Sequence, residues 1–155
     1  GQLLTDYFDV PVEIEQFVGG WYDLEPASQC HIGDDSSPSA QLGWGSVVGD
    51  AVWDQQSRVR IRLGPMTRPK YEEFLPTGSA YAPLRSLTRF FSSDQYDFDV
   101  QLVMVRDDVP SCALGLDDAS TPPLGWCTWL RSTPFVRDPD DTILPLDDTR
   151  APVWP

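Results

Sequence analysis

Few residues of this chain have the types and the spacing that enzyme chemistry requires. Asp97 and Asp99 form the best pair, because alternate residues of a strand point to one side and two carboxylates can cleave a glycosidic bond. The pair has low specificity in a chain with 24 acidic residues. It leaves a hydrolytic, carbohydrate-active enzyme as the alternative function. That function requires two carboxylates that converge in a concave pocket, at least one of them with a raised pKa.

Other kinds of chemistry have weaker support. A serine or cysteine nucleophile needs a histidine base, but the one histidine, His31, is adjacent to Cys30, and chain neighbours rarely form a productive pair. The three cysteines form no Cys-x-x-Cys motif, whereas structural zinc takes four closely spaced ligands. The sequence also lacks the glycine-rich motifs of nucleotide sites. We therefore expect no catalytic activity, cofactor, metal or small-molecule substrate.

The charge balance argues against nucleic acid as a partner. Eleven basic residues against 24 acidic ones give a net charge of −13, which repels phosphate backbones and anionic lipid. No apolar run approaches the roughly 18 residues that a membrane span needs. We therefore expect a water-soluble chain that neither binds nucleic acid nor inserts into a membrane.

A repeated tripeptide organises the chain, since Leu42-Gly43-Trp44 recurs as Leu124-Gly125-Trp126. With this offset, six of the seventeen positions from 30 to 46 are identical to those from 112 to 128. Unrelated segments would share about one. The match predicts an internal duplication of one unit, built from a strand, a polar loop, the tripeptide and a second strand. Its anchors are Gly33, Leu42, Gly43, Trp44, Gly115, Leu124, Gly125 and Trp126.

The duplication also bears on the cysteines and tryptophans. Cys30 and Cys112 occupy equivalent positions, which favours two half-buried thiols in a reducing compartment, while a disulfide between them stays open. Trp44 and Trp126 are expected to act as core anchors behind the glycine bend.

The hydropathy pattern predicts strands and two helices. Strict alternation over 58–63 places apolar residues in the core and three arginines on the opposite face, exposed to solvent or paired with the chain's own acids. A short helix over 67–75, with Thr67 as N-cap, precedes a longer one from 79 or 80 to 91. The longer helix should bury Tyr81, Leu84, Leu87, Thr88 and Phe91. Another strand is expected at 12–24, with a bend at Gly19-Gly20, and further strands at 46–53, 100–105, 128–130 and 143–146.

These elements predict an α+β fold of two pseudo-repeated, mostly antiparallel β units joined by a two-helix segment. The first unit spans 1–65 with a long loop at about 23–41, and the helical connector spans 66–93. The second unit spans 94–146 with a long loop at about 107–123, and 147–155 forms a tail.

Each long loop carries apolar residues among polar ones, and loops of such length are usually functional. Because both copies share this feature, we expect two similar contacts to copies of one partner protein. The residues expected to bind the partner are Leu24, Pro26, Ala27, Ile32, Val109, Pro110, Leu114 and Leu116.

The order of several short motifs resembles the C-terminal half of the TssG family, the baseplate wedge subunits of the bacterial type VI secretion system. These motifs are Val10-Pro11-Val12-Glu13-Ile14-Glu15-Gln16-Phe17, Leu42-Gly43, Gly49-Asp50-Ala51-Val52-Trp53-Asp54, Arg60-Ile61-Arg62-Leu63-Gly64-Pro65, Tyr71, Phe74-Leu75-Pro76, Leu124-Gly125 and Thr128-Trp129-Leu130. The similarity extends to about Leu146.

The resemblance implies a non-enzymatic scaffold in the bacterial cytoplasm, assembled at the inner face of the inner membrane. It implies that the protein joins TssF subunits and that two extended loops bind TssK trimers. The chain begins at Gly1, within what looks like the end of a helix, and lacks the N-terminal helical half expected of the family. We therefore expect it to be part of a longer protein.

Overall fold

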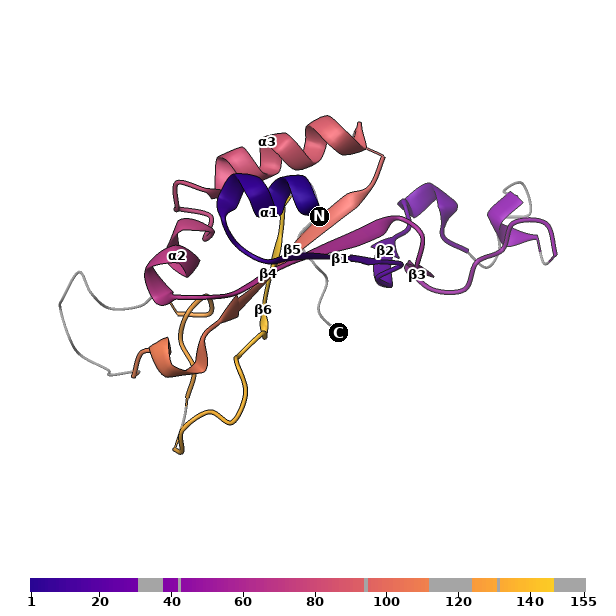
Figure 1. Ribbon diagram of the computed structural model, residues 1–155. Helices are drawn as coiled ribbons and strands as arrows, with labels where there is room; N and C mark the ends of the chain where they lie inside the picture. The colour runs from indigo at the N-terminus through magenta and orange to yellow at the C-terminus, as the bar shows by residue number, and fades with distance from the viewer. Residues whose placement is uncertain (31–37, 42, 94, 112–123, 131, 147–155) are drawn as a thin grey trace.

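The computed structural model describes residues 1–30, 38–41, 43–93, 95–111, 124–130 and 132–146. A four-stranded sheet forms the centre, helices lie along one face of it, and a two-stranded ribbon extends to one side (Figure 1). The expected α+β class is therefore confirmed. None of the helices in these ranges is long and apolar enough to cross a membrane.

The central sheet combines strands from both predicted units. Its order is β1 (Val12–Gln16), β4 (Arg58–Met66), β5 (Asp97–Met104) and β6 (Thr142–Pro145). The two outer pairings are antiparallel and the central β4–β5 pairing is parallel. The division of the chain into two units stays a prediction, because one sheet contains strands from both.

Parallel neighbours require a crossover, and the two predicted helices supply it. Helices α2 (Arg68–Glu73) and α3 (Tyr81–Ser92) lie in sequence between β4 and β5. Thr67 is the N-cap residue of α2, as expected, although its side chain makes no capping hydrogen bond. A third helix, α1 (Gln2–Phe8), lies near α3 in Figure 1 and confirms the helical reading of the chain's first residues.

Strand β4 shows the expected alternation. Ile61 and Leu63 are buried in the core beneath the helices, while Arg58, Arg60 and Arg62 lie on the opposite face. The core joins residues from all three helices to β4, β5 and β6, namely Leu4, Phe8, Tyr71, Phe74, Leu84, Ile61, Leu63, Val100, Leu102 and Leu144.

Gly64 marks an irregularity in the pairing of β4 with β5, where the register shifts between Leu63 and Met66. Its φ angle is +116°, and a Cβ atom added there would lie 2.4 Å from the carbonyl oxygen of Val103. Glycine is therefore required at this position both by the backbone conformation and by the approach of the neighbouring strand.

The ribbon consists of β2 (Gly20–Asp23) and β3 (Ala51–Asp54), paired antiparallel. Two short 3-10 turns, Pro26–Ser28 (η1) and Pro38–Ala40 (η2), lie between β2 and β3 in sequence, and a third lies at Arg106–Asp108 (η3).

Three expectations about individual elements were wrong. The strand expected at 46–53 begins only at Ala51, because Gly49 has a φ angle of +108° and interrupts the extended backbone. Residues 128–130 form no strand, since Gly125 and Thr128 are joined in a turn by a hydrogen bond. Phe91 is exposed although the rest of its expected helix face packs on the core, because it lies in the last turn of α3, beside a groove.

Candidate functional site

The two copies of the repeated tripeptide adopt the same local conformation. Gly43 has a φ angle of +83° and Gly125 one of +84°, and each lies in a turn that also contains the following tryptophan. Glycine is the residue that adopts such angles without strain. Leu124 is exposed, whereas Leu42, Gly33 and Gly115 lie outside the described residues. The two turns therefore share a backbone conformation at their glycines, and the internal duplication stays a prediction.

The two tryptophans differ in their surroundings. Trp126 is half-buried and packs against the core, as expected. Trp44 is 84% exposed, so its expected role as a core anchor was wrong. The cause is position, because the first turn lies at the end of the ribbon region while the second lies against α2.

Hydrogen bonds from distant residues anchor the second turn. The hydroxyl of Tyr71 donates to the carbonyl oxygen of Trp126 over 2.7 Å, and the hydroxyl of Thr142 donates to the same oxygen over 3.0 Å. Burial raises the pKa of the Tyr71 hydroxyl well above its usual value, so this donor is protonated at any physiological pH. The ring of Trp129 lies edge-on to that of Tyr71, with 6.3 Å between centroids. Two leucines, Leu124 at 90% and Leu130 at 95% exposure, are left on the surface.

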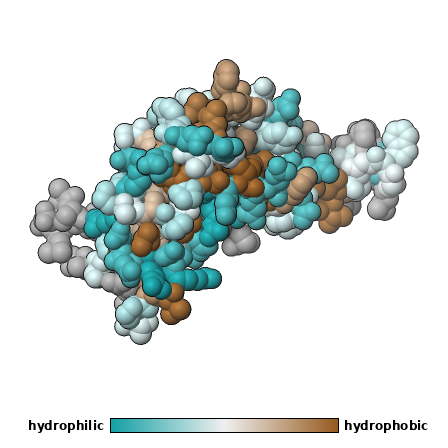
Figure 2. All heavy atoms as spheres, in the orientation of Figure 1, coloured by the Kyte–Doolittle hydropathy of each residue, from teal (hydrophilic) through white to brown (hydrophobic). Residues whose placement is uncertain are grey.

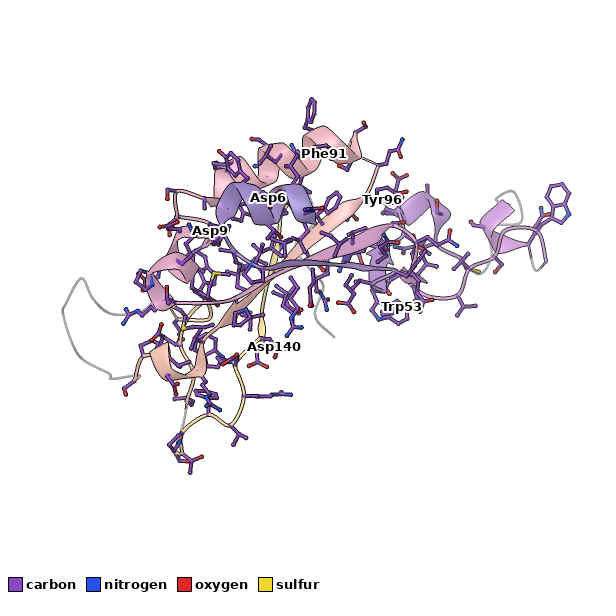
Figure 3. All side chains as sticks on the ribbon, in the orientation of Figure 1. Asp6, Asp9, Trp53, Phe91, Tyr96 and Asp140 are labelled. Atoms are coloured by element: carbon purple, nitrogen blue, oxygen red, sulfur yellow. The ribbon has the colours of Figure 1, made fainter. Side chains whose placement is uncertain are left out.

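The first turn belongs to a projection that we call the first arm, residues 20–54. At its base Trp21 and Trp53 face one another across the ribbon, with ring centroids 5.4 Å apart (Trp53 is labelled in Figure 3). The ribbon continues through a backbone hydrogen bond from Leu24 to Asp50. Figure 1 shows this part of the chain extending away from the sheet and helices.

Further contacts within the first arm support its outer part. The side-chain amide of Gln29 donates to the carbonyl of Leu24 over 2.9 Å. The hydroxyl of Ser46 donates to the sulfur of Cys30 over 3.3 Å, which joins the two sides of the arm next to the Trp44 turn. Cys30 is a free thiol here. Trp44, Val47 and Val48 are exposed at this end.

The structure places only some of the predicted partner-binding residues on the surface. Pro26 and Ala27 are exposed in η1, and Leu24 and Pro110 are half-buried. Val109 is 4% exposed and belongs to the core, which corrects the prediction for that residue. It was misjudged because its loop is rich in Asp and Pro, although a turn of η3 returns it to the sheet. Ile32, Leu114 and Leu116 lie outside the described residues.

Sequence reasoning missed the apolar side chains that are most exposed in these two regions. They are Trp44, Val48, Leu124, Leu130 and Val136. The tripeptide itself was the available signal, but it was interpreted as a core motif. Single exposed apolar residues are ordinary, whereas a contiguous apolar patch marks an interaction site, so these side chains are candidates for partner contact.

The structure places Asp99 beside two arginines of β4. The carboxylate of Asp99 lies 3.6 Å from Arg58 and 3.9 Å from Arg60 on the sheet face opposite the helices. Its pKa is raised, chiefly by burial and also by Asp97, while both arginines oppose the shift. Three surface hollows in the described part of the chain are lined by other residues. The raised pKa therefore accompanies a structural ion pair, and the geometry gives the hydrolase alternative no support.

These ion pairs form a charge ladder across three strands. Arg60 also pairs with Glu15 at 3.8 Å. Arg62 lies 3.4 Å from both Glu13 and Asp140. The prediction that the arginines pair with the chain's own acids is therefore confirmed.

A further apolar feature lies between α1, α3 and the sheet. It is a groove of about 370 Å³, with Ile14, Val59 and Phe98 of the sheet as its floor. Figure 3 labels Phe91 and Tyr96, which also line it, and Figure 2 shows apolar surface beside these helices. The described residues contain no group of three or more His, Cys, Asp or Glu side chains placed to hold a metal ion.

Comparison with known proteins gives a consistent result. The family model described as "Type VI secretion, TssG" matches residues 1–131. No curated protein sequence matches the chain. Two solved structures share its fold. The first is described as the TssK-TssF-TssG baseplate subcomplex of the type VI secretion system, revealed by cryo-electron microscopy, with a TM-score of 0.61 and 19% identity over 93% of this chain. The second is the baseplate complex from the type VI secretion system, with a TM-score of 0.57 and 20% identity over 93%. The chain covers 57% and 40% of the matched chains.

Proposed function

This chain belongs to the TssG family of the type VI secretion system, and on that premise we propose that it is a structural subunit of the baseplate wedge. In this role it joins TssF subunits and binds TssK through two loop regions. We propose that the chain acts in assembly at the cytoplasmic face of the inner membrane and that it catalyses no reaction.

The observation that carries this proposal is the presence of exposed apolar side chains in two chain regions attached to one core. Trp44 and Val48 lie on the first arm, and Leu124 and Leu130 lie on the second tripeptide turn and beyond it. Buried apolar anchors supply most of the free energy in protein interfaces, and turns held by hydrogen bonds reduce the ordering cost of presenting such anchors. One of the two solved structures that share the fold is of a complex whose description names TssK and TssF, which supports these two partners.

A pull-down with purified TssK and TssF from the same organism tests the proposal. The immobilised wild-type chain should retain TssK, and a variant that carries both Trp44→Asp and Leu130→Asp should lose it, because an aspartate cannot enter an apolar pocket. Phe90→Asp is the matched control, because Phe90 is 80% exposed on α3, outside both regions. Circular dichroism should show that all three proteins are folded. If the folded wild type retains neither TssK nor TssF, the proposed function is wrong.

A further inference from the structure

The first arm has an unusual charge composition. Residues 20–54 contain six acidic side chains and no lysine or arginine. In the described part, Asp23, Glu25 and Asp50 are exposed. The second loop region, which we define as residues 106–138, contains five acidic residues and three arginines, so its net charge is about a third of that of the first arm. The two regions therefore differ in net charge.

The apolar anchors of the two regions also differ. The first arm presents a tryptophan ring from a turn that is fixed by Gly43 and by a hydrogen bond of 3.2 Å from the Trp44 amide to the Gln41 carbonyl. Val48 is exposed four residues further on. In the second turn Trp126 packs inward, so the exposed apolar groups are the leucines Leu124 and Leu130. The same Leu-Gly-Trp turn thus exposes a tryptophan in the first arm and leucines in the second region.

We propose that the two loop contacts are not equivalent, and that the first arm docks through Trp44 into an apolar pocket whose rim carries lysine or arginine side chains. This inference rests on the proposed function and specifies the partner surface for one of its two contacts. The indole fills the pocket, while the acids of the arm face the basic rim and accelerate the encounter. The second region binds through its two leucines, and its binding depends only weakly on salt because its own arginines offset its acids.

Two matched variants separate the contacts. Trp44→Ser leaves the second region intact, whereas the double variant Leu124→Ser/Leu130→Ser leaves the first arm intact. The wild type, these two variants and the control Phe90→Ser are each assayed for binding to purified TssK by surface plasmon resonance. Because a tryptophan hot spot contributes at least about 2 kcal/mol, Trp44→Ser should raise the Kd of the first-arm contact by about thirty-fold, while the second contact keeps its affinity. Phe90→Ser should leave both contacts unchanged.

Salt provides the second readout. Between about 50 and 500 mM NaCl, the Leu124→Ser/Leu130→Ser variant should lose about tenfold in association rate, and Trp44→Ser should change far less. Adding Asp23→Asn, Glu25→Gln and Asp50→Asn to the leucine variant should remove most of this sensitivity. As the control, Asp107→Asn and Asp108→Asn neutralise acids of the second region in the same leucine variant. These two changes should leave its salt sensitivity in place.

The outcomes distinguish the inference from the function on which it rests. If the folded wild type does not bind TssK, the proposed function fails and the inference fails with it. If the wild type binds but Trp44→Ser binds equally well, or if both loop variants show the same salt dependence, the proposed function stands. The inference of two non-equivalent contacts is then wrong.

Discussion

The carbonyl oxygen of Trp126 accepts hydrogen bonds from both Tyr71 and Thr142, and this shared acceptor predicts a specific failure of additivity. Tyr71→Phe removes one donor and should cost about 1 kcal/mol, the usual net value of a hydrogen bond. Thr142→Val is nearly isosteric and should cost a similar amount. In each single variant the oxygen keeps one donor, so neither leaves a buried acceptor unpaired.

The double variant leaves this half-buried oxygen without either donor. Desolvation of an unpaired acceptor costs about 1–3 kcal/mol, so the double variant should lose more than the two single variants together, by about 1–2 kcal/mol. Urea unfolding monitored by circular dichroism gives the four free energies of unfolding of the cycle, which are comparable if the m-values agree.

Tyr81→Phe is a suitable control. Its hydroxyl donates over 2.9 Å to a different carbonyl, that of Pro145. Combined with Tyr71→Phe, it should give an additive loss. If Tyr71→Phe and Thr142→Val are additive within about 0.5 kcal/mol, the two hydroxyls do not act through one oxygen and the reasoning about how this turn is anchored is refuted.

Further predictions concern glycines and carboxylates. Gly64→Ala should lower the free energy of unfolding by about 2–5 kcal/mol, because strain adds to a clash with Val103, whereas Gly43→Ala meets nothing within 4 Å and should cost only about 1–2 kcal/mol of strain. Equal losses in chemical denaturation would contradict this. The raised pKa of Asp99 means that its stabilising contribution is complete below the unfolded pKa near 4 and is lost as pH rises through the folded value. Asp99→Asn should therefore remove a downward slope of stability that sets in as the pH rises above about 4. The pKa of Asp54 is lowered by the Ser57 hydroxyl and the Gln56 amide, so Asp54→Asn should remove stability that is present above about pH 4 and lost in more acidic buffer. Urea titrations from pH 3 to pH 7 would reveal both slopes, and unchanged profiles would count against the ion-pair and turn geometry.

The parts of the fold that could be predicted are those determined by local periodicity. Strand β4 was recognised because Val59, Ile61 and Leu63 alternate with arginines, and α3 because its apolar residues recur at helical spacing. The β3 strand was predicted too long, since a single glycine conformation ended the extension.

The tripeptide shows where sequence information runs out. Identical residues gave nearly identical φ angles at Gly43 and Gly125, because turn conformation is a local property. Whether the next tryptophan is buried depends on which side chains lie behind it. For Trp126 these include Tyr71, a residue distant in sequence whose proximity only the tertiary fold creates. For the same reason Val109 could not be recognised as a core residue from its polar loop.

Gly64 also determines which residues of β4 and β5 face each other. A slip of one residue would turn every arginine of β4 toward the core and is therefore strongly disfavoured. A slip of two residues would keep the arginines on their face and next to acidic neighbours, so the charge ladder alone cannot prevent it. It would, however, place a residue with a side chain where the carbonyl of Val103 approaches the backbone of β4. In this sheet the arginines of β4 determine which face is exposed to solvent, and the absence of a side chain at Gly64 determines the register of β4 against β5.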